Sequence, residues 1–306
     1  MAQVLVCGAR MSPRLSIVVP TCRRREALAE CLERLAPSVQ KDVSAPYEVI
    51  VTDDGSSDPS ESLVTARFPW VRWVLGPARG PAANRNSGAG HASGEWLVFL
   101  DDDCLPSERL VFAYENAINS SPDAQVFEGR ISVPRPRERL LETAPANETG
   151  GCLWACNFAI RRSFFEEVGR FEERFPHASM EDVDLHRRVL KKLAQVPFVP
   201  AAVVVHPWRP FDPERTFWVQ RESEFIFAEL HPGDSVAKSL RYWLRTYLRA
   251  LVKEVPVTFL RYPSETLRTY PRYVCMQCIH LWALATGKDS SFFAARLAQL
   301  QRSRST

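Results

Sequence analysis

The 306-residue sequence has no apolar run of the 18 or so residues that a membrane-spanning helix needs. The longest candidate lies near Tyr273 to Thr286, so we do not expect an integral membrane protein. The first residues also lack the pattern of a secretory signal peptide. We therefore expect the eight cysteines to be reduced thiols in the cytoplasm, and any membrane contact to be peripheral, at the inner face.

Zinc-binding cysteine pairs are also lacking. Cys275 and Cys278 have zinc-like internal spacing, but no second pair follows and their neighbours are apolar, so buried thiols are the simpler interpretation. No internal repeat is present. With 45% hydrophobic and 25% charged residues, the composition is that of an ordinary globular protein.

Charge is unevenly distributed along the chain. The formal net charge is +3, from 39 Lys and Arg against 36 Asp and Glu. Residues 211–306 hold 14 basic and 9 acidic residues, which leaves 25 basic against 27 acidic in residues 1–210. The basic excess therefore lies wholly in the last third. We expect no nucleic-acid partner.

Short β-rich runs alternate with helical patterns between Leu15 and Leu100, which predicts an α/β fold with a mainly parallel sheet flanked by helices. Beyond Pro210 the pattern becomes helical and aromatic. We predict an N-terminal extension over residues 1–13, an α/β domain over 14–210 and a helical, basic region over 211–306.

Local sequence patterns predict the start of one helix and the position of one long loop. Asp58, Pro59 and Glu61 have the pattern of an N-cap, a first helical residue and a capping-box acid. The segment from Pro134 to Gly150 is rich in proline and charge, which predicts a mobile loop.

The stretch GEWLVFLDDDCLP ends an apolar run in three consecutive acids, Asp101, Asp102 and Asp103. Like charges about 4 Å apart repel by roughly 4 kcal/mol at an effective dielectric constant near 20. In an open α/β sheet, ligands bind at the carboxyl ends of the strands. Mg²⁺ or Mn²⁺ binds there through one or two carboxylates and substrate phosphates, so we expect a divalent cation to offset the acids.

Five segments occur in an order and spacing that resembles family 2 glycosyltransferases with the GT-A fold. The resemblance covers roughly residues 14–206 and rests on the following segments: VVPTCRRREALAECL, VIVTDDGSSD, ANRNSGAGHASGEWLVFLDDDCLP, CNFAIRRSFFEEVGRFEERF and EDVDLHRR. No single motif is decisive, whereas five in sequence are specific.

The resemblance implies a nucleotide-binding set in which Thr21 and Asp54 hold the base and Arg85 contacts the nucleotide. The set that we expect is Pro20, Thr21, Asp53, Asp54, Arg79, Arg85, Asp101 and Asp102. Cys22 and Arg23 stand where the family often has an aromatic residue and an asparagine, which changes the expected contact to the base. Arg23, Arg24 and Arg25 either reach phosphates or form a solvated helix start.

For the metal, Mn²⁺ or Mg²⁺, the resemblance implies Asp103 as the direct ligand, with Asp101 nearer the ribose. His206, at the end of a late strand, occupies the place where some members supply a further metal or phosphate contact. The alternative for this histidine is a structural role beside a proline.

The resemblance also implies a general base at Asp182, with Glu181 orienting the acceptor. The alternative is that Ser179 caps a helix with Asp182 in its first turn, where an acid stabilises the helix dipole by about 0.3–1 kcal/mol. Trp154 either stacks on a sugar or belongs to the core.

The function implied is metal-dependent, inverting transfer of a sugar from a nucleotide-diphosphate sugar, UDP- or dTDP-linked, to an acceptor hydroxyl. The acceptor is a saccharide, a lipid-linked sugar or another hydroxyl compound, as in cell-surface polysaccharide or glycolipid synthesis. One alternative is a sugar-phosphate nucleotidyltransferase, but PTCRRR lacks that class's phosphate-loop glycine. The other is a non-catalytic nucleotide-sugar-binding protein.

The tail contains SLRYWLRTYLRALVKEV, in which Arg241, Arg245, Arg249 and Lys253 recur every four residues beside four leucines. This pattern predicts a basic amphipathic helix, with Trp243 and Tyr247 of the type found at membrane interfaces. An anionic membrane attracts each such charge by about 1 kcal/mol. The alternative is a helix that packs on the catalytic domain with a solvated basic face.

Overall fold

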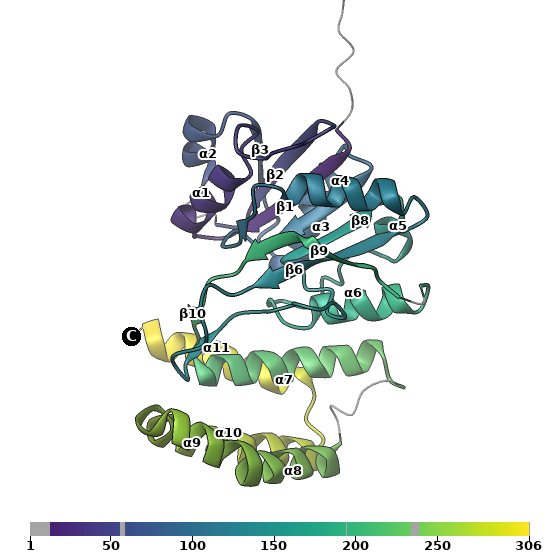
Figure 1. Cartoon of the computed structure of the whole chain (residues 1–306). Helices are drawn as coiled ribbons and strands as arrows, with labels where there is room; N and C mark the ends of the chain where they lie inside the picture. The colour runs from purple at the N-terminus through teal and green to yellow at the C-terminus, as the bar shows by residue number, and fades with distance from the viewer. Residues whose placement is uncertain (1–12, 56–58, 194, 234–238, 306) are drawn as a thin grey trace, which may run out of the picture.

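A computed structural model describes residues 13–305, except 56–58, 194 and 234–238. Its main feature is an eight-stranded sheet (Figure 1). The strands of this sheet are β1 (Leu15–Thr21), β2 (Tyr47–Asp53), β3 (Val71–Leu75), β4 (Trp96–Leu100), β5 (Leu105–Pro106), β6 (Val126–Ser132), β8 (Asn157–Arg161) and β9 (Phe198–Val205).

The strands lie in the order β3-β2-β1-β4-β8-β6-β9-β5. The first four are parallel, β8 is antiparallel to both of its neighbours, and β6 and β9 are again parallel. Thr21 pairs with Asp53 in the register of β1 and β2, so the carboxyl ends of these strands meet at one edge. The predicted α/β fold with a mainly parallel sheet is confirmed.

Alternate residues of the strands enter two different cores, as the two-residue period of a strand requires. Ile17 and Val98 pack in one core with α1, α2 and α4, whereas Val18 and Phe99 pack in the other with α3, α5 and α6. The helices are α1 (Arg25–Arg34), α2 (Glu61–Arg67), α3 (Pro81–Gly90), α4 (Leu110–Ser120), α5 (Arg162–Glu167) and α6 (Glu181–Leu190). Both faces of the sheet are therefore covered.

The start of α2 differs from the prediction. The helix begins at Glu61 with Ser60 as N-cap, so Pro59 is not its first residue. The backbone N–H and hydroxyl of Ser60 both donate to the carboxylate of Asp53, at 2.6 and 2.7 Å, and these bonds fix the chain just before the helix. The predicted cap, Asp58, lies outside the described residues.

The segment predicted as a mobile loop, Pro134 to Gly150, contains a strand and a buried acid. Strand β7 (Glu142–Thr143) pairs with β10 (Arg209–Pro210). The carboxylate of Glu142 accepts hydrogen bonds from Arg135 and from the N–H groups of Glu138 and Arg139. These contacts organise the loop around one carboxylate.

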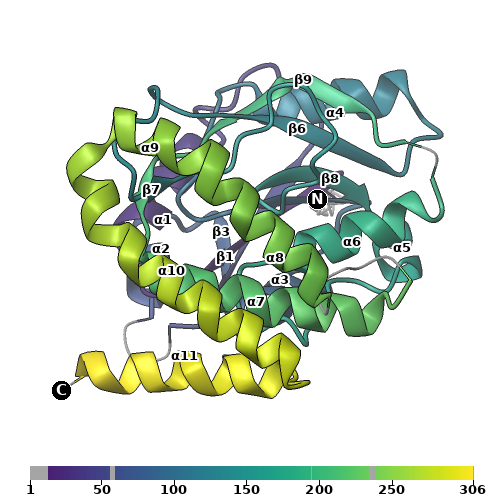
Figure 2. The same ribbon diagram turned by 90° about the horizontal axis from the view of Figure 1, so that it is seen from below.

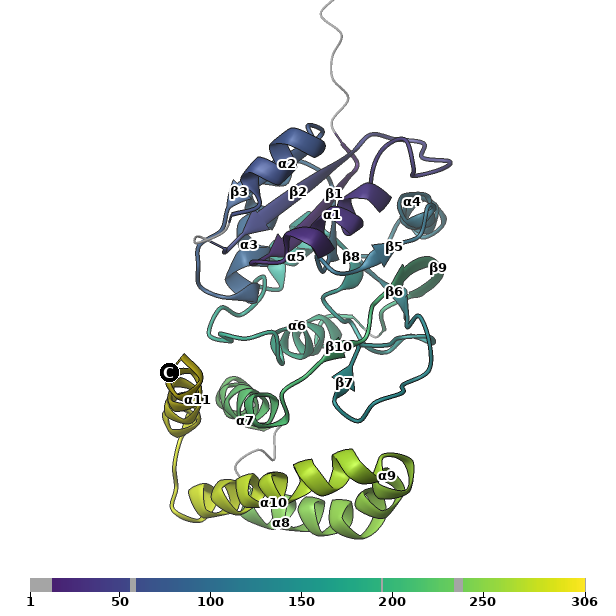
Figure 3. The ribbon, with the colours of Figure 1, turned by 90° about the vertical axis from the view of Figure 1, so that its left-hand side faces the viewer.

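After Pro210 the described chain contains only helices, arranged in two tiers below the sheet (Figure 3). The upper tier pairs α7 (Pro213–Leu230) with α11 (Ser290–Ser305), and the lower contains α8 (Leu240–Arg249), η1 (Ala250–Glu254), α9 (Val255–Arg261) and α10 (Pro263–Ala285). Seen from below, the lower tier of helices lies in front of the sheet (Figure 2). None of the helices in the described part of the chain combines the length and apolar character needed to cross a bilayer.

The basic helix predicted in the tail is present, but two of its aromatic residues lie elsewhere than expected. Trp243 and Tyr247 are buried in the tail's own core, where the guanidinium of Arg221 lies 4.0 Å from the Trp243 ring. Tyr247 is hydrogen-bonded to His280 at 2.6 Å. The interfacial placement of these two rings was therefore wrong, because they complete a core that α8 alone cannot bury.

Candidate active site

The carboxyl edge of the sheet is hollowed by a pocket of about 620 Å³. Pro20 and Thr21 end β1, Asp54 follows β2 and Asp101 follows β4, while Arg85 projects from α3. These five members of the predicted nucleotide-binding set line the pocket. Strand order brings the first four together, since β2 and β4 are the parallel neighbours of β1, and Arg85 reaches the same edge from α3.

Asp54 is held in place by the turn before α3. Its carboxylate accepts from the N–H groups of Ala78, at 2.9 Å, and Gly80, at 3.3 Å. Gly80 has a φ of 94°, and a Cβ there would lie 2.7 Å from the carbonyl oxygen of Pro176, so glycine is required. Partial burial raises the pKa of Asp54. The carboxylate is thus positioned on the pocket wall by fixed backbone donors.

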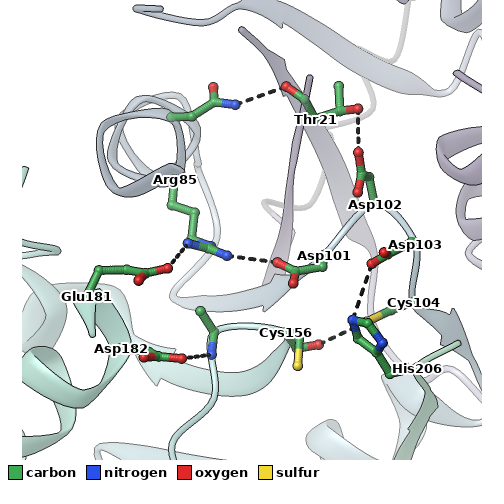
Figure 4. Close-up of polar contacts among 12 residues, drawn as sticks. Thr21, Arg85, Asp101, Asp102, Asp103, Cys104, Cys156, Glu181, Asp182 and His206 are labelled. Atoms are coloured by element: carbon green, nitrogen blue, oxygen red, sulfur yellow. Dashed lines mark hydrogen bonds and ion pairs between the residues drawn. The ribbon is translucent and has the colours of Figure 1, made fainter. Parts of the chain in front are cut away.

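Three predicted members of the set do not line this pocket. Asp53 is buried, and its carboxylate is occupied by Gly55 and Ser60. Arg79 is 66% exposed and pairs with Glu173 at 2.9 Å. Asp102 is fully buried behind Thr21, whose hydroxyl donates to it at 2.6 Å (Figure 4). None of the three lines the pocket, so their contacts with a nucleotide stay predictions.

Arginines lie against all three acids that follow β4. Arg85 contacts Asp101 at 2.8 Å, Arg24 contacts Asp102 and Asp103 at 2.9 and 3.0 Å, and Arg209 contacts Asp103 at 3.0 Å. We expected a metal to offset this charge, but the chain's own cations already do so. Arg24 stands at the start of α1 and is 41% exposed, as a solvated helix start requires, but its guanidinium also pairs with two of these acids.

These contacts set the protonation of the first two acids. Burial alone would raise the pKa of Asp101, but Arg85 and Arg209 outweigh it, and the pKa lies below its usual value. Burial raises the pKa of Asp102 to about 7, against the opposing influence of Arg24 and Thr21. Asp101 is therefore held in its ionised form at the pocket, whereas burial favours the protonated form of Asp102.

Asp103 and His206 form the part of the site that fits a cation. His206 Nδ1 lies 2.9 Å from the carbonyl oxygen of Pro207, which can only accept, so Nδ1 carries the proton and Nε2 is an acceptor. Asp103 Oδ1 lies 3.4 Å from this Nε2, and it is buried without a hydrogen-bond partner (Figure 4). Two facing acceptors of this kind suit a cation between them.

The remaining neighbours of this pair define which cation fits. Cys104 Sγ lies within 4.8 Å of the Asp103 and His206 ligand atoms, but burial and its contact with Cys156 hold its pKa well above the usual value. Carboxylate oxygens suit Mg²⁺ and Mn²⁺ better than a thiol does. Arg209 donates to His206 Nε2 at 2.7 Å, so it competes with a cation for the same lone pair.

A second pocket, of about 540 Å³, lies at the start of α6 and contains both Glu181 and Asp182. Met180, just before the helix, has a φ of 71°, a conformation that costs a non-glycine residue free energy. No side chain caps the helix, so the interpretation of Ser179 as N-cap was wrong. The strained residue turns the first helical acids toward the pocket instead.

Glu181 and Asp182 have different partners. Asp182 accepts from the N–H of Val183 at 2.8 Å and, weakly, from that of Ala155 at 3.4 Å. Glu181 is bound by Arg85 at 2.9 Å, while its second oxygen is buried without a hydrogen-bond partner. Burial raises the pKa of both acids, that of Glu181 to about 7. Among the described residues, no cationic side chain lies within salt-bridge distance of Asp182, in contrast to Glu181.

The two pockets share a wall built from Arg85, Asp101, Ala178 and Arg209. Arg85 is 3% exposed and links Asp101 on one side to Glu181 on the other (Figure 4). Trp154 lines the second pocket and packs against the first core, so its place beside the core is confirmed and its stacking on a sugar stays a prediction. A ligand that occupies both pockets passes over a single buried arginine.

Sequence reasoning missed Arg209 altogether. It stands three residues after His206 in the segment HPWRP, and β10 holds it against β7. A count of charges at the sheet edge gives a signal for a further cation. The three acids after β4 outnumber the two arginines assigned to the site, Arg79 and Arg85, so one acid had no assigned partner. Local pattern does not connect residue 209 to residue 103, because the pairing depends on the path of the chain after β9.

Comparisons with known proteins agree with this architecture. A sequence profile described as Glycosyl transferase family 2 matches residues 16–169. An uncharacterized glycosyltransferase of Haemophilus influenzae is 30% identical over 202 residues, which cover 60% of this chain and 64% of that protein. An N-acetylglucosaminyl-diphospho-decaprenol L-rhamnosyltransferase of Mycobacterium tuberculosis is 26% identical, covering 66% of this chain and 81% of that protein.

Among solved structures, S. aureus TarS 1-349 in complex with UDP superposes with a TM-score of 0.55 at 16% identity, covering 90% of this chain and 92% of that chain. At this identity the likeness shows the fold, which is that of GT-A glycosyltransferases. The family profile covers half of the sequence, and the chain therefore belongs to glycosyl transferase family 2.

Proposed function

We propose that the protein is a metal-dependent, inverting glycosyltransferase that moves a sugar from a nucleotide-diphosphate sugar to an acceptor hydroxyl. The observation that carries this proposal is the pair of pockets that meet at Arg85 and Asp101. One contains the acids of a nucleotide site and the other contains Asp182. A donor in the first pocket and an acceptor in the second would meet at the shared wall.

The donor side is suited to a pyrimidine nucleotide. Asp54 accepts hydrogen bonds at the pocket wall, as recognition of a uracil or thymine imide requires, and Thr21 lies beside it. Asp101 remains ionised there and can accept a ribose hydroxyl. The structural neighbour TarS was solved with UDP, which favours a UDP- or dTDP-linked sugar.

Asp103 and His206 would hold Mn²⁺ or Mg²⁺, with Asp101 nearby. When bound, the cation supplies positive charge against the phosphates of the departing nucleoside diphosphate. The chain's own contribution is to present Asp103 Oδ1 and His206 Nε2 as facing acceptors. Arg209 and Arg24 must give up part of their contact with Asp103 for this to occur.

On the acceptor side, Asp182 would take the proton of the attacking hydroxyl. Burial raises its pKa above the ordinary aspartate value, which makes it a stronger base than an exposed aspartate. Glu181, held by Arg85, would orient the acceptor through its free oxygen. The hydroxyl attacks from the face opposite the leaving phosphate, so the anomeric configuration inverts.

Incubation with UDP-, dTDP- and GDP-sugars and Mn²⁺ tests the reaction class. Glycosyl transfer releases a nucleoside diphosphate, a nucleotidyltransferase exchanges pyrophosphate, and a binding protein releases neither. Thermal stabilisation by each donor with and without Mn²⁺ identifies the nucleotide independently of turnover. Pyrophosphate exchange, or donor binding with no turnover for any acceptor class, would contradict the proposal.

We also propose that the tail contacts an anionic membrane. Arg241, Arg245 and Arg249 are exposed on α8. The leucines between them are exposed too, from 40% to 54%, at positions Leu240, Leu244 and Leu248. Changing the three arginines to glutamine should weaken the free energy of binding to anionic vesicles by about 1 kcal/mol per charge. Co-sedimentation with the vesicles measures this change. Parent protein that stays in the supernatant at low salt would contradict this contact.

A further inference from the structure

Three side chains with different metal-binding atoms meet at the end of β9: a carboxylate, a thiol and an imidazole. Asp103, Cys104 and His206 each offer one atom, and these atoms all lie within 4.8 Å of one another (Figure 4). Asp103 is 6% exposed, and Cys104 and His206 are fully buried. The proposed sugar transfer uses the carboxylate and the imidazole, and it gives no role to the thiol.

Strand pairing places the thiol beside the imidazole. Strands β5 and β9 pair in an antiparallel register in which Leu105 lies opposite Val205. Cys104 precedes β5 and His206 follows β9, so the same register sets these two residues opposite each other. The N–H of Cys104 donates to the carbonyl oxygen of Asp101 at 3.1 Å, and this turn fixes the backbone before β5. The backbone therefore holds both groups in place before any ion binds.

The distances within the cluster match a small tetrahedral ion. Zn²⁺ binds nitrogen and oxygen at about 2.0–2.2 Å and sulfur at about 2.3 Å, so tetrahedral geometry separates its ligand atoms by about 3.3–3.6 Å. Asp103 Oδ1 and His206 Nε2 are already 3.4 Å apart. Asp103 Oδ1 is also buried without a hydrogen-bond partner in the described part of the chain. A shift of about 1 Å by the Cys104 sulfur completes a set of three ligands.

Arg209 competes for part of this position. Its guanidinium donates to His206 Nε2 at 2.7 Å and contacts Asp103 Oδ2 at 3.0 Å. The second contact uses the other carboxylate oxygen, so an ion at Oδ1 displaces only the first. The Arg209 side chain is 38% exposed and lines the donor pocket, where solvent hydrates the displaced nitrogen. Entry of an ion therefore leaves no charge buried and unpaired.

The thiol determines which ion this set favours. Thiolate and imidazole ligands suit Zn²⁺, whereas Mg²⁺ and Mn²⁺ prefer carboxylate oxygens and phosphates. A bound Zn²⁺ replaces the thiol proton, which passes to solvent. We propose that Asp103, Cys104 and His206 bind Zn²⁺, and that Zn²⁺ there excludes the Mn²⁺ or Mg²⁺ of the proposed transfer. The site shares two ligands with that reaction, but zinc binding itself requires neither nucleotide nor acceptor.

Co²⁺ is the probe for the thiol ligand. It accepts the same tetrahedral sites as Zn²⁺, and a cobalt–thiolate bond gives an intense charge-transfer absorption in the near ultraviolet. The full chain, kept reduced and free of nucleotide, is titrated with Co²⁺, and Zn²⁺ is then added in competition. We expect a charge-transfer band that an equivalent of Zn²⁺ removes. A spectrum without this band at an excess of Co²⁺ overturns the inference.

Substitution of single cysteines localises the band. Cys104→Ser should remove it and weaken Zn²⁺ binding at least about 10-fold, since even the loss of a group that only supports a ligand costs about 10–100-fold. Cys156→Ser is the matched control, because Cys156 is buried against Cys104 and lies outside the set of ligand atoms. The control should keep the band. A band that survives in Cys104→Ser overturns the assignment.

Two further measurements cover the other outcomes. The exposed residues Cys275 and Cys278 offer a competing thiol site, and a band that disappears when both are changed to serine places the ion in the tail and overturns the assignment. If Cys104→Ser does not fold, X-ray absorption of the zinc-loaded parent decides. One sulfur neighbour with nitrogen and oxygen neighbours supports the site, and two sulfurs or none overturns it.

Mn²⁺ binding in the presence of UDP separates this inference from the proposed function. Zn²⁺ should release Mn²⁺ from the parent complex, as followed by electron paramagnetic resonance. Cys104→Ser should need at least about 10-fold more Zn²⁺ for the same release, because its Asp103 and His206 remain. Equal release from both proteins overturns the role of the thiol. Parent protein that shows the cobalt band but binds no nucleotide contradicts only the proposed function.

Discussion

In the α/β half the three acids after β4 face arginines, whereas in the tail large apolar side chains face outward. Twelve of the fifteen exposed large hydrophobic residues in the described chain lie after Pro210. The α/β half buries its apolar residues on both faces of one sheet, and the tail buries only one side of α8 to α10. The difference indicates that the first half is adapted to hold charged ligands and the second to meet an apolar environment.

The largest effect that we expect in the α/β half comes from Asp182→Asn. The amide keeps the shape of the side chain but does not take a proton, so turnover should fall by about 10²–10⁴-fold, or roughly 3–5 kcal/mol of barrier. Donor affinity and most of the stability should remain. Transfer at saturating donor is the measurement.

Glu181→Gln is the neighbouring control for Asp182→Asn. It removes charge from the pair with Arg85 and leaves Asp182 in place. A collapse of turnover confined to Glu181→Gln would move the base by one residue. Turnover of Asp182→Asn within a few-fold of the parent would remove Asp182 from the mechanism.

The next effect concerns Asp103, where a cation and arginines compete. Asp103→Ala should weaken Mn²⁺-dependent binding of UDP by roughly 100-fold, since hard divalent cations depend on carboxylate oxygen. UDP binding without metal should change much less, because Arg24 and Arg209 are released toward the phosphates. Titration of UDP with and without Mn²⁺ compares the two. An unchanged affinity with Mn²⁺ contradicts Asp103 as a ligand.

A smaller effect should appear in the pH dependence of stability. The pKa of Asp102 is about 7 in the folded chain and near 3.8 ordinarily, so the folded state retains a proton that the unfolded state has lost. This contribution is complete below about pH 4 and is lost as pH rises through 7. It amounts to about 1–4 kcal/mol.

Asp102→Asn tests that contribution, because the amide keeps an acceptor for Thr21 and does not titrate. Urea unfolding at pH 5, 6, 7 and 8 should show a steeper decline in the parent than in the variant. The raised pKa of Glu181 adds a decline common to both proteins. Parallel curves for the two proteins would show that Asp102 is ionised throughout.

The position of the site at the carboxyl edge of the sheet was predictable from the sequence. It depends on the alternation of strand and helix patterns and on the order of the strands, which local sequence indicates. The strand ends at Thr21, Asp54 and Asp101 meet at one edge as the alternation of strands and helices predicts. The partners of the acids were not predictable in the same way. The pairing of Arg24 with these acids was not predicted and Arg209 was missed, since their contacts with Asp103 join residues separated by 79 and 106 positions.

In the tail, too, tertiary contacts were not predictable from the local pattern. Its amphipathic period correctly predicted a basic helix, but the period does not say which apolar residues face the core. Trp243 and Tyr247 lie inside because α7, α10 and α11 present aromatic partners to them. Tertiary packing therefore decides which apolar residues of α8 are buried, and its leucines at 240, 244 and 248 remain exposed.

The smallest effect in stability should come from Leu248→Ser, on the outer face of α8. Leu248 is 54% exposed, so its loss should change the free energy of unfolding by less than about 0.5 kcal/mol. Trp243→Ala, on the inner face of the same helix, should cost about 3–5 kcal/mol, because it empties a core position. Leu248→Ser should nevertheless lower the affinity for anionic vesicles by roughly 10- to 100-fold, since a leucine buried in lipid contributes about 1.5–3 kcal/mol. Urea unfolding and vesicle sedimentation on the same samples separate the two effects. If Leu248→Ser destabilises the fold as strongly as Trp243→Ala, the outer face is part of the core; if it changes neither quantity, the exposed leucines do not enter the membrane.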